Sequence, residues 1–399
     1  MKHLFPGATG HFSLIQGCYW MTYCILISFS SLYLLDRGFT NTQIGLLLGI
    51  AGLTAAILQP FVGAKGDHLK VLSLRQFTSL PIAAMILCGV GLLLVPAKPV
   101  QAALYMVLLV LLQLLTPLIY SLGMDCLNNH IELNFGLARG IGGGTYALAS
   151  AVCGSLAAAL GARVIPLVLV VAVALMLAFT FTFRQGGPVK STLPKPDALP
   201  QSDGTPFLKK YPQVLPLLIG VILLYTSHNV IMNFPYQIVR SLGCGSAEMG
   251  HYLTLQSLMD IPAMVVFSLL LKRASSRAWV RLTGISFFLH ALLTWLAPNL
   301  PFLMVVQVFE MSGYALYSVS SVYFVNEMVD LCDRVQGQTY FTMANTIGIV
   351  LSSVLGGRLL DLDGASAALC LATVTGAAGM VILWFLLRRK SLRPATNAA

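Results

Sequence analysis

Long apolar runs cover most of the chain, and each has the length of a helix that crosses a bilayer. Such a helix needs about 20 consecutive, mostly apolar residues. The runs form two sets of six, separated by one longer polar stretch. The first set comprises Phe12–Leu35, Thr42–Ala64, Leu74–Val95, Ala102–Gly123, Leu137–Leu160 and Val164–Phe183. The second comprises Val214–Val239, Met249–Leu271, Val280–Ala297, Phe302–Val325, Thr339–Leu360 and Ala365–Leu387. The pattern predicts an all-α membrane protein with twelve transmembrane helices in two six-helix bundles.

The polar stretch between the two sets is Arg184–Pro212, which is rich in proline, lysine and small polar residues. It is too polar to cross a membrane, and its prolines disfavour a long helix. We therefore expect an N-terminal bundle at 1–183, a cytoplasmic linker at 184–212 and a C-terminal bundle at 213–399.

The composition agrees with a membrane protein. Hydrophobic residues make up 57% of the 399 positions and charged residues 10%, whereas soluble domains have about 45–50% and about 25%. The first apolar run is too long for a cleavable signal peptide, so we expect it to remain as the first helix.

The formal net charge of +10 raises the question of a nucleic-acid partner, and the positions of the basic residues answer it. If the N-terminus is cytoplasmic, nineteen of the 24 lysines and arginines fall on cytoplasmic segments and five on the outer side. This asymmetry is the positive-inside bias of membrane proteins. It predicts a multi-pass protein of the cell (inner) membrane with both termini in the cytoplasm and no nucleic-acid partner.

Motifs of several enzyme classes are absent from the sequence. There is no H-E-x-x-H, no G-x-S-x-G and no phosphate-binding P-loop, which argues against an intramembrane hydrolase and against a primary pump. The eight cysteines form no C-x-x-C pair, and no histidine–cysteine cluster has metal-ligand spacing. We therefore expect neither an enzyme nor a bound cofactor or metal.

Two segments of the first half recur in the second half at nearly the same distance. Cys153–Ala162 aligns with Gly356–Ala365 at a shift of 203, and the loop after the second apolar run aligns with the loop after the eighth at a shift of 205. Weak similarity of this kind is typical of transporters built from two repeated bundles. Chance similarity between glycine-rich helices is the alternative.

The stretch Gln59–Arg75 resembles the signature loop between helices two and three of the major facilitator superfamily. The matching positions are Gly63, Gly66, Asp67 and Arg75. The glycines would admit a tight cytoplasmic turn, and Asp67 would engage basic groups and a helix N-terminus. His68 stands where the family has a basic residue, so any charge relay here would be weaker or sensitive to pH.

The stretch Asn134–Gly154 resembles the lactose-permease-like, oligosaccharide–proton symporter branch of that superfamily. The resemblance lies in a Gly-x-Ala-Arg sequence followed by an aromatic residue, here Gly136, Ala138, Arg139 and Tyr146. It implies that Arg139 binds substrate hydroxyls and that Tyr146 stacks on the substrate ring. From the residues alone, Arg139 could instead be an anchor at the cytoplasmic interface, and the glycines at four-residue spacing would allow close helix packing.

The sequence departs from this branch on several other helices. The carboxylate that pairs with the family's arginine would fall at Ser121, and the nearest acid is Asp125, one turn later. The glutamate of helix eight falls at Ser257, the arginine of helix nine at His290, and the histidine of helix ten near Glu310. The resemblance therefore implies the fold but not lactose as the solute.

Further polar side chains lie inside the apolar runs, where a charged group costs roughly 2.5–3.5 kcal/mol on insertion scales. They either face a solute pathway or pair with a neighbouring helix, and for the histidines both explanations stay open. The candidates for proton coupling are Glu310, which has Gln307 and no basic residue on its own run, and Asp260. Besides Arg139 and Tyr146, the candidates for solute binding are Tyr19, Tyr23, Asp125, His228, Asn229, Asn233, Gln256, His290 and Gln307.

Together these features predict a secondary transporter that works by alternating access. We expect a proton-coupled symporter that imports a small hydroxylated solute, a sugar or nucleoside first, and that functions as a monomer in the lipid bilayer. A proton-coupled antiporter that exports a small organic compound is the alternative within the same class. A membrane sensor of the same fold that binds but does not transport its solute is the alternative from another class.

Overall fold

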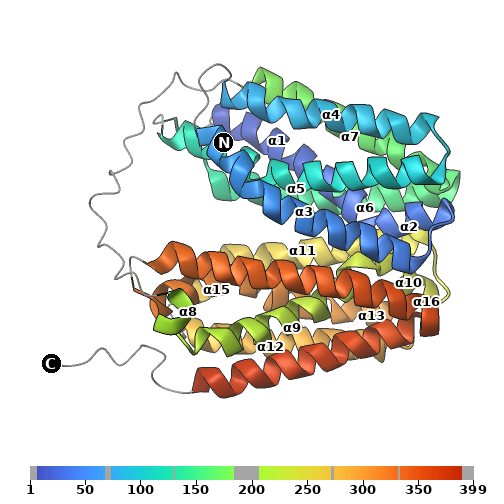
Figure 1. Ribbon diagram of the computed structural model, residues 1–399. Coiled ribbons are helices and arrows are strands. Elements are labelled where there is room, and N and C mark those ends of the chain that lie inside the picture. The colour runs from blue at the N-terminus through green and yellow to red at the C-terminus, as the bar shows by residue number, and fades with distance from the viewer. Residues whose placement is uncertain are drawn as a thin grey trace. The chain divides into compact units, whose positions relative to one another are not determined.

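The computed structural model of the chain describes residues 7–67, 73–128, 131–183, 206–270, 274–330 and 333–388. In these ranges every regular element is a helix (Figure 1). Eight helices of the described part are long and apolar enough to cross a membrane, and nine are if the bent pair Gly7–Ser28 and Ser30–Asp36 forms one span. The twelve predicted runs are predominantly helical where they are described, while twelve separate spans remain a prediction.

The chain divides into two compact units. Unit 1 comprises Met1–Thr192 and Asn233–Leu258, and unit 2 comprises Leu193–Met232 and Met259–Ala399. The contacts of Asn233–Leu258 therefore group this segment with the first half of the chain.

Unit 1 is built from helices that pack side by side. It contains α1 (Gly7–Tyr23), a π-helical turn (Cys24–Ser28), α2 (Ser30–Asp36), α3 (Asn41–Asp67), α4 (Leu74–Leu94), α5 (Lys98–Asn128), α6 (Phe135–Leu160), a 3-10 turn (Ala162–Val164), α7 (Ile165–Thr182), α10 (Pro235–Ser241) and the first part of α11 (Ser246–Leu270). The most extensive packing joins α1 to α6, while α4 packs on α5 and α7 and α3 packs on α5. Side chains such as Phe12 and Met176 are fully buried between these helices.

Unit 2 contains the rest of α11 and the remaining helices. These are α8 (Phe207–Lys210), α9 (Val214–Asn233), α12 (Ser276–Trp295), α13 (Leu300–Val306), α14 (Val308–Glu310), a second π-helical turn (Met311–Ala315), α15 (Leu316–Met328) and α16 (Arg334–Arg388). The element α16 is two helices joined across Gly364, which has non-helical backbone angles. The core of unit 2 contains Phe207 of α8, Tyr211 just after it, Leu224 of α9, Phe287 of α12 and Tyr317 of α15.

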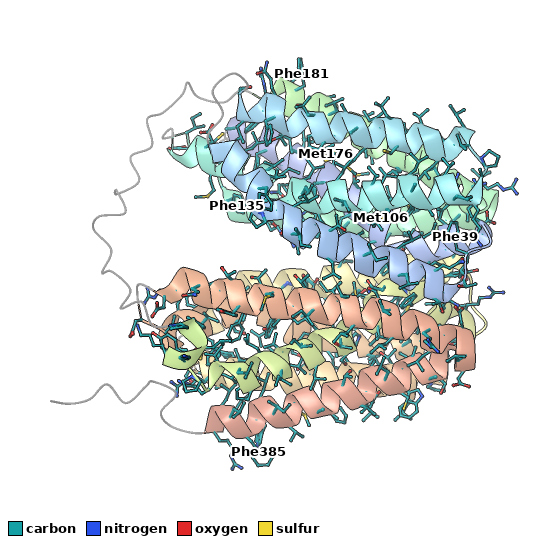
Figure 2. The ribbon with its side chains drawn as sticks, in the orientation of Figure 1. Phe39, Met106, Phe135, Met176, Phe181 and Phe385 are labelled. Atoms are coloured by element: carbon teal, nitrogen blue, oxygen red, sulfur yellow. The ribbon has the colours of Figure 1, made fainter. Side chains whose placement is uncertain are left out.

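Large apolar side chains also lie on the surface of each unit. Phe181 of α7 and Phe385 of α16 project outward (Figure 2), with 60% and 64% of their surface exposed. Exposed apolar faces of this kind are expected where a protein contacts lipid, because the bilayer core solvates them without the penalty that water imposes.

Several helices differ in their limits from the sequence-based expectation. The run predicted at Val214–Val239 breaks at Phe234, because Pro235 cannot continue the hydrogen-bond ladder and instead begins α10. The helix α3 continues through Gly63 and Gly66 to Asp67, so the expected tight turn does not lie at these glycines. His68 and the residues up to 72 fall outside the described part of the chain.

The end of the predicted linker also differs. Most of 184–212 lies outside the described residues, but Phe207 and Tyr211 are buried in the core of unit 2 with 2% and 0% exposure. Their aromatic side chains make burial favourable in spite of the neighbouring lysines and prolines. This part of the stretch is therefore a packed element of unit 2 and not a solvated linker.

Backbone geometry supports the predicted duplication. Four glycines of the described residues have positive φ, and they form two pairs, Gly38 with Gly243 and Gly161 with Gly364. The members of the pairs are 205 and 203 residues apart, as in the sequence alignment. The seven-residue helices α2 and α10 are also 205 residues apart. A backbone with positive φ favours glycine at that position. The recurrence of such glycines at these shifts therefore indicates two repeats of one architecture.

Candidate functional site

In unit 1, Arg139 is stacked on an aromatic ring. The side chain of Asn134 caps α6 by accepting a hydrogen bond from Leu137 N at 2.9 Å, which places Arg139 in the second turn of the helix. Its guanidinium carbon lies over the ring of Trp20 of α1, 3.9 Å from the ring centre. This distance is well inside the range of about 6 Å over which cation–π attraction is effective.

The pairing of α1 with α6 makes this stacking possible. A Cβ atom at Gly142 would lie 2.5 Å from Cδ1 of Trp20, so the glycine leaves the space that the indole occupies. One turn further on, Thr145 donates a hydrogen bond to Gly17 O at 3.1 Å and ties the two helices together. Gly142 therefore accommodates Trp20. The glycines at four-residue spacing do not serve close packing as expected, because a Cβ atom at Gly140 or Gly144 would meet nothing within 4 Å.

Tyrosines surround this pair. Tyr19 meets Trp20 edge-on with ring centres 5.4 Å apart, and Tyr23 is tilted against it at 5.1 Å. The hydroxyls of Tyr19 and Thr116 of α5 are hydrogen-bonded at 2.5 Å. Tyr146 is buried between α6 and the π-helical turn, where its hydroxyl pairs with that of Ser28 at 2.6 Å. The half-buried rings beside Arg139 are thus Trp20 and Tyr23.

Sequence reasoning missed Trp20. Its indole lies within the first apolar run, and nothing in the spacing of α1 shows which side chain meets Arg139. The one available signal was Gly142, because a glycine with no turn to make inside a helix often marks a close approach by a neighbour.

In unit 2, three polar side chains from three helices meet in the interior. His228 comes from α9, His290 from α12 and Glu310 from the end of α14, and each is at most 4% exposed. The Nδ1 atoms of the two histidines each lie 3.6 Å from Oε2 of Glu310. The ring of Tyr314 stacks on His228 with centres 4.9 Å apart and an interplanar angle of 5°.

Local structure explains how Glu310 reaches this cluster. Gln307, fully buried one turn earlier, donates its amide to Leu303 O at 3.0 Å. The π-helical turn Met311–Ala315 follows Glu310 directly. Such turns insert one residue into a helix, and they are frequent at functional sites.

The cluster can perform two kinds of chemistry. The ligand atoms of His228, His290 and Glu310 all lie within 4.8 Å of one another, so they could hold a metal ion; two imidazoles and a carboxylate are donors that zinc accepts. The same groups can share a proton, because both histidines approach one carboxylate oxygen. The spacing of these residues in the sequence does not show the cluster, since 62 and 20 positions separate them.

The remaining candidates for solute binding, and the proton-coupling candidate Asp260, lie on α5, α9 and α11. Asn229 donates its amide to Tyr225 O of its own helix at 2.9 Å. Asn233 and Gln256 are buried at 4% and 3% exposure. Asp125 on α5 and Asp260 on α11 are half-buried.

The signature-loop residues lie at two helix ends. Gly63, Gly66 and Asp67 form the last turns of α3. Arg75, in the first turn of α4, donates a hydrogen bond to Phe183 O at 3.1 Å and lies 5.6 Å from the ring centre of Phe181. Arg75 therefore ties the start of α4 to the end of α7.

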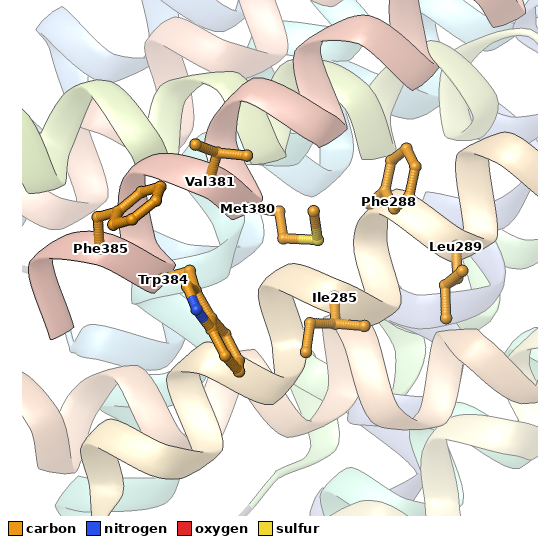
Figure 3. Close-up of a pocket in the computed structure, with 7 residues that line it drawn as sticks. All are labelled: Ile285, Phe288, Leu289, Met380, Val381, Trp384 and Phe385. Atoms are coloured by element: carbon orange, nitrogen blue, oxygen red, sulfur yellow. The ribbon is translucent and has the colours of Figure 1, made fainter. Parts of the chain in front are cut away.

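An apolar groove on unit 2 does not suit a hydroxylated solute. It runs between α12 and α16 and is lined by Ile285, Phe288, Leu289, Met380, Val381, Trp384 and Phe385 (Figure 3). A sugar or nucleoside site needs several convergent hydrogen-bonding groups, and this lining is almost entirely apolar. We therefore assign the groove to the apolar surface of unit 2.

Comparison with known proteins adds the family. The profile of the MFS_1 like family matches residues 13–370. The chain belongs to this family. It is therefore a transporter of the major facilitator superfamily and a multi-pass membrane protein.

Solved structures show the same fold for this major facilitator transporter. Two crystal structures of the nucleoside transporter NupG, one of a point mutant and one without that change, superpose with TM-scores of 0.78 and 0.74. Each covers 96% of this chain and 99% of its own, at 13% and 15% sequence identity.

A curated relative matches part of the transporter. It is a protein of Deinococcus radiodurans whose name is that of a sugar efflux transporter, with 28% identity over 167 residues. The match spans 41% of this chain and 42% of the relative's own length.

Proposed function

We propose that this transporter is a proton-coupled symporter that imports a small hydroxylated solute, a sugar or a nucleoside first, by alternating access. The observation that carries the proposal is the buried cluster of Glu310, His228 and His290 in unit 2. The names of the relatives, a nucleoside transporter and a sugar efflux transporter, support the solute class. No catalytic reaction is proposed.

The charge of the cluster provides the coupling. With both imidazoles neutral, an ionised Glu310 is a buried negative charge beside His228 and His290. An uncompensated charge in the interior costs several kcal/mol. One proton, on Glu310 or shared with a histidine, removes this cost, so proton uptake and release accompany the exposure of the cluster to either side.

Arg139 provides the solute contact. Its five N–H donors suit pairs of hydroxyl oxygens, and the rings of Trp20 and Tyr23 beside it suit the apolar face of a sugar or a base. The other solute ligands expected from the sequence, among them Tyr146 and Asp125, stay proposed ligands of the same solute.

The proposal is tested with Glu310→Gln in proteoliposomes that are supplied with labelled uridine or labelled glucose. The amide resembles the protonated acid in shape and charge, so the variant should bind and exchange solute across the membrane. It should not accumulate solute when a pH gradient is imposed, because it cannot release a proton. Asp363→Asn removes an exposed carboxylate from α16 and should behave like the wild type.

Three results would change the assignment. Accumulation by Glu310→Gln at the wild-type level would move the proton role to Asp260 or His228. Loss of binding would place Glu310 in the solute site. Loss of wild-type transport after treatment with a chelator, with recovery on addition of Zn²⁺, would show that the cluster works with a metal ion and not with a proton.

Export by proton antiport is the second candidate, and the name of the Deinococcus radiodurans relative favours it. The direction of the gradient distinguishes the two. Symport fills proteoliposomes whose lumen is more alkaline than the bath, since protons and solute enter together. Antiport fills those whose lumen is more acidic. A membrane sensor would bind solute and fill neither.

The orientation follows from the charge asymmetry of the loops. We propose a monomer in the inner membrane with both termini in the cytoplasm. A reporter inserted after Lys195 should be cytoplasmic, and one inserted at Gly243 should lie outside. The opposite labelling would reverse the orientation without affecting the transport proposal.

A further inference from the structure

We propose that Trp20 is a positioning residue of the solute site: its indole holds the guanidinium of Arg139 in a fixed plane, and Gly142 keeps the space that the indole needs. The inference rests on the proposed function, because Arg139 is the solute ligand in that proposal. It adds a residue of α1, outside the arginine motif of α6, to the determinants of solute affinity.

Stacking orients a guanidinium without using its hydrogen-bond donors. The N–H groups of arginine lie in the plane of the guanidinium and point away from its rim. With its carbon 3.9 Å from the ring centre of Trp20, one face of Arg139 is covered, and the rim stays available for two parallel hydrogen bonds to a solute. An arginine that was free to rotate would lose that conformational freedom when it bound a solute, and this entropic cost would weaken the affinity.

In the described part of the chain, no carboxylate forms an ion pair with Arg139. Among the described residues, every ion pair within 4.0 Å involves a cation other than Arg139. A carboxylate partner would occupy the donors that a solute needs. The contact with Trp20 therefore fixes the side chain while leaving it able to bind.

Packing, and not hydrogen bonding, fixes Trp20 itself. A buried indole N–H normally has an acceptor, but Nε1 of Trp20 is buried and has no hydrogen-bond partner among the described residues. The ring is held by Arg139 on its face, by Tyr19 and Tyr23 at its sides, and by the close approach to Gly142. A methyl group at position 142 would lie 2.5 Å from Cδ1 and 3.2 Å from Cγ, so the rigid indole would have to move as a whole.

The first test measures uptake and exchange of uridine and glucose by Trp20→Ala and Trp20→Phe. Loss of a partly desolvated cation–π contact corresponds to about a 5- to 30-fold rise in KM, with the maximal exchange rate little changed. Trp20→Phe retains an aromatic face and should recover most of the affinity. A general folding defect would lower the amount of active protein and hence the maximal rate, not KM.

A second pair of variants leaves Trp20 in place. Gly142→Ala should raise KM because it displaces the indole, whereas Gly144→Ala, which has nothing within 4 Å of the added methyl group, should not. In the background of Arg139→Lys, which cannot form the planar fork, Trp20→Ala should cost little further affinity. This non-additivity is the mark of a residue that acts through another.

The outcomes separate the two proposals. If the wild type binds neither probe, the proposed function fails, and the positioning role fails with it. If the wild type binds but Trp20→Ala and Gly142→Ala retain the wild-type KM, only the positioning role is overturned. Fully additive effects of Trp20→Ala and Arg139→Lys would also overturn it, because Trp20 would then act independently of Arg139.

Discussion

In unit 1 the backbones of Gly154 and Gly250 approach each other closely. This contact predicts that Gly154→Ala and Gly144→Ala have opposite effects on stability. A Cβ atom at Gly154 of α6 would lie 2.7 Å from Ser246 O and 2.8 Å from Gly250 Cα, against 3.4 Å or more in an ordinary contact. At Gly250 of α11 it would lie 2.6 Å from Ser150 O. All of these neighbours are backbone atoms, which cannot rotate away as a side-chain end can.

Gly154→Ala should therefore force the two helices apart or strain their backbones. Overpacking of this kind costs about 1–3 kcal/mol, which corresponds to roughly 2–12 °C in the melting temperature of a unit of this size. Gly144→Ala, on the same helix but facing open space, should gain up to about 1 kcal/mol from the higher helix propensity of alanine.

The assay is thermal unfolding of the purified protein in detergent, followed by intrinsic fluorescence. It compares two alanine variants of one helix, so differences in helix propensity cancel and the backbone contact remains. The reasoning is refuted if Gly154→Ala is as stable as Gly144→Ala, since the two helices would then not approach each other at these glycines.

Two further predictions concern charged groups outside the spans. The hydrogen bond to the Asp333 carboxylate, at 2.7 Å, raises the pKa of Lys210 above its ordinary value. A lysine whose pKa is raised in the folded state contributes stability that is fully present below its ordinary pKa and is lost only as pH rises through its folded-state pKa. Lys210→Met should therefore lower the free energy of unfolding by about 1.5–3 kcal/mol, and by the same amount from pH 6 to pH 9. A loss that shrinks within this window contradicts the pairing. Hydrogen bonds from N–H groups of its own turn lower the pKa of Glu248. Its contribution to stability is therefore present above the ordinary pKa near 4.5 and is lost as pH falls. Glu248→Gln should lower the melting temperature slightly at pH 7 and not at pH 3, and an equal loss at both pH values would exclude the charge as its cause.

The positions of the helices could be predicted from the sequence, and their interruptions largely could not. Apolarity over about 20 residues is a strong signal, and the predicted runs are predominantly helical where they are described. The π-helical turns at Cys24–Ser28 and Met311–Ala315 have no comparable signal, because they change one hydrogen bond and not the composition. The break at Phe234 did have one in Pro235, which the average apolarity of the run concealed.

The candidate clusters show a similar limit. Glu310, His228 and His290 each stood out as a polar group in an apolar run, but which of them meet depends on helix packing across more than 60 residues. Trp20 did not stand out at all, because an indole in such a run is compatible with lipid contact, core packing or a site. Polarity therefore identified buried polar candidates one by one, whereas packing was needed to identify their partners.

The duplication relates the two clusters to each other. At the shift of 205, Phe29 corresponds to Phe234, the residues at which the two repeated helices break, and α2 corresponds to α10. At the same shift, Tyr23 corresponds to His228. One repeat therefore places a tyrosine beside Trp20 and Arg139, and the other places a histidine beside Glu310. The helix breaks at Phe29 and Phe234 lie at the same distance along the chain from Tyr23 and His228. The two repeats therefore share the backbone of this segment and differ in the side chain at this position. We infer that a single ancestral position now serves the proposed solute contact in one unit and the proposed proton cluster in the other.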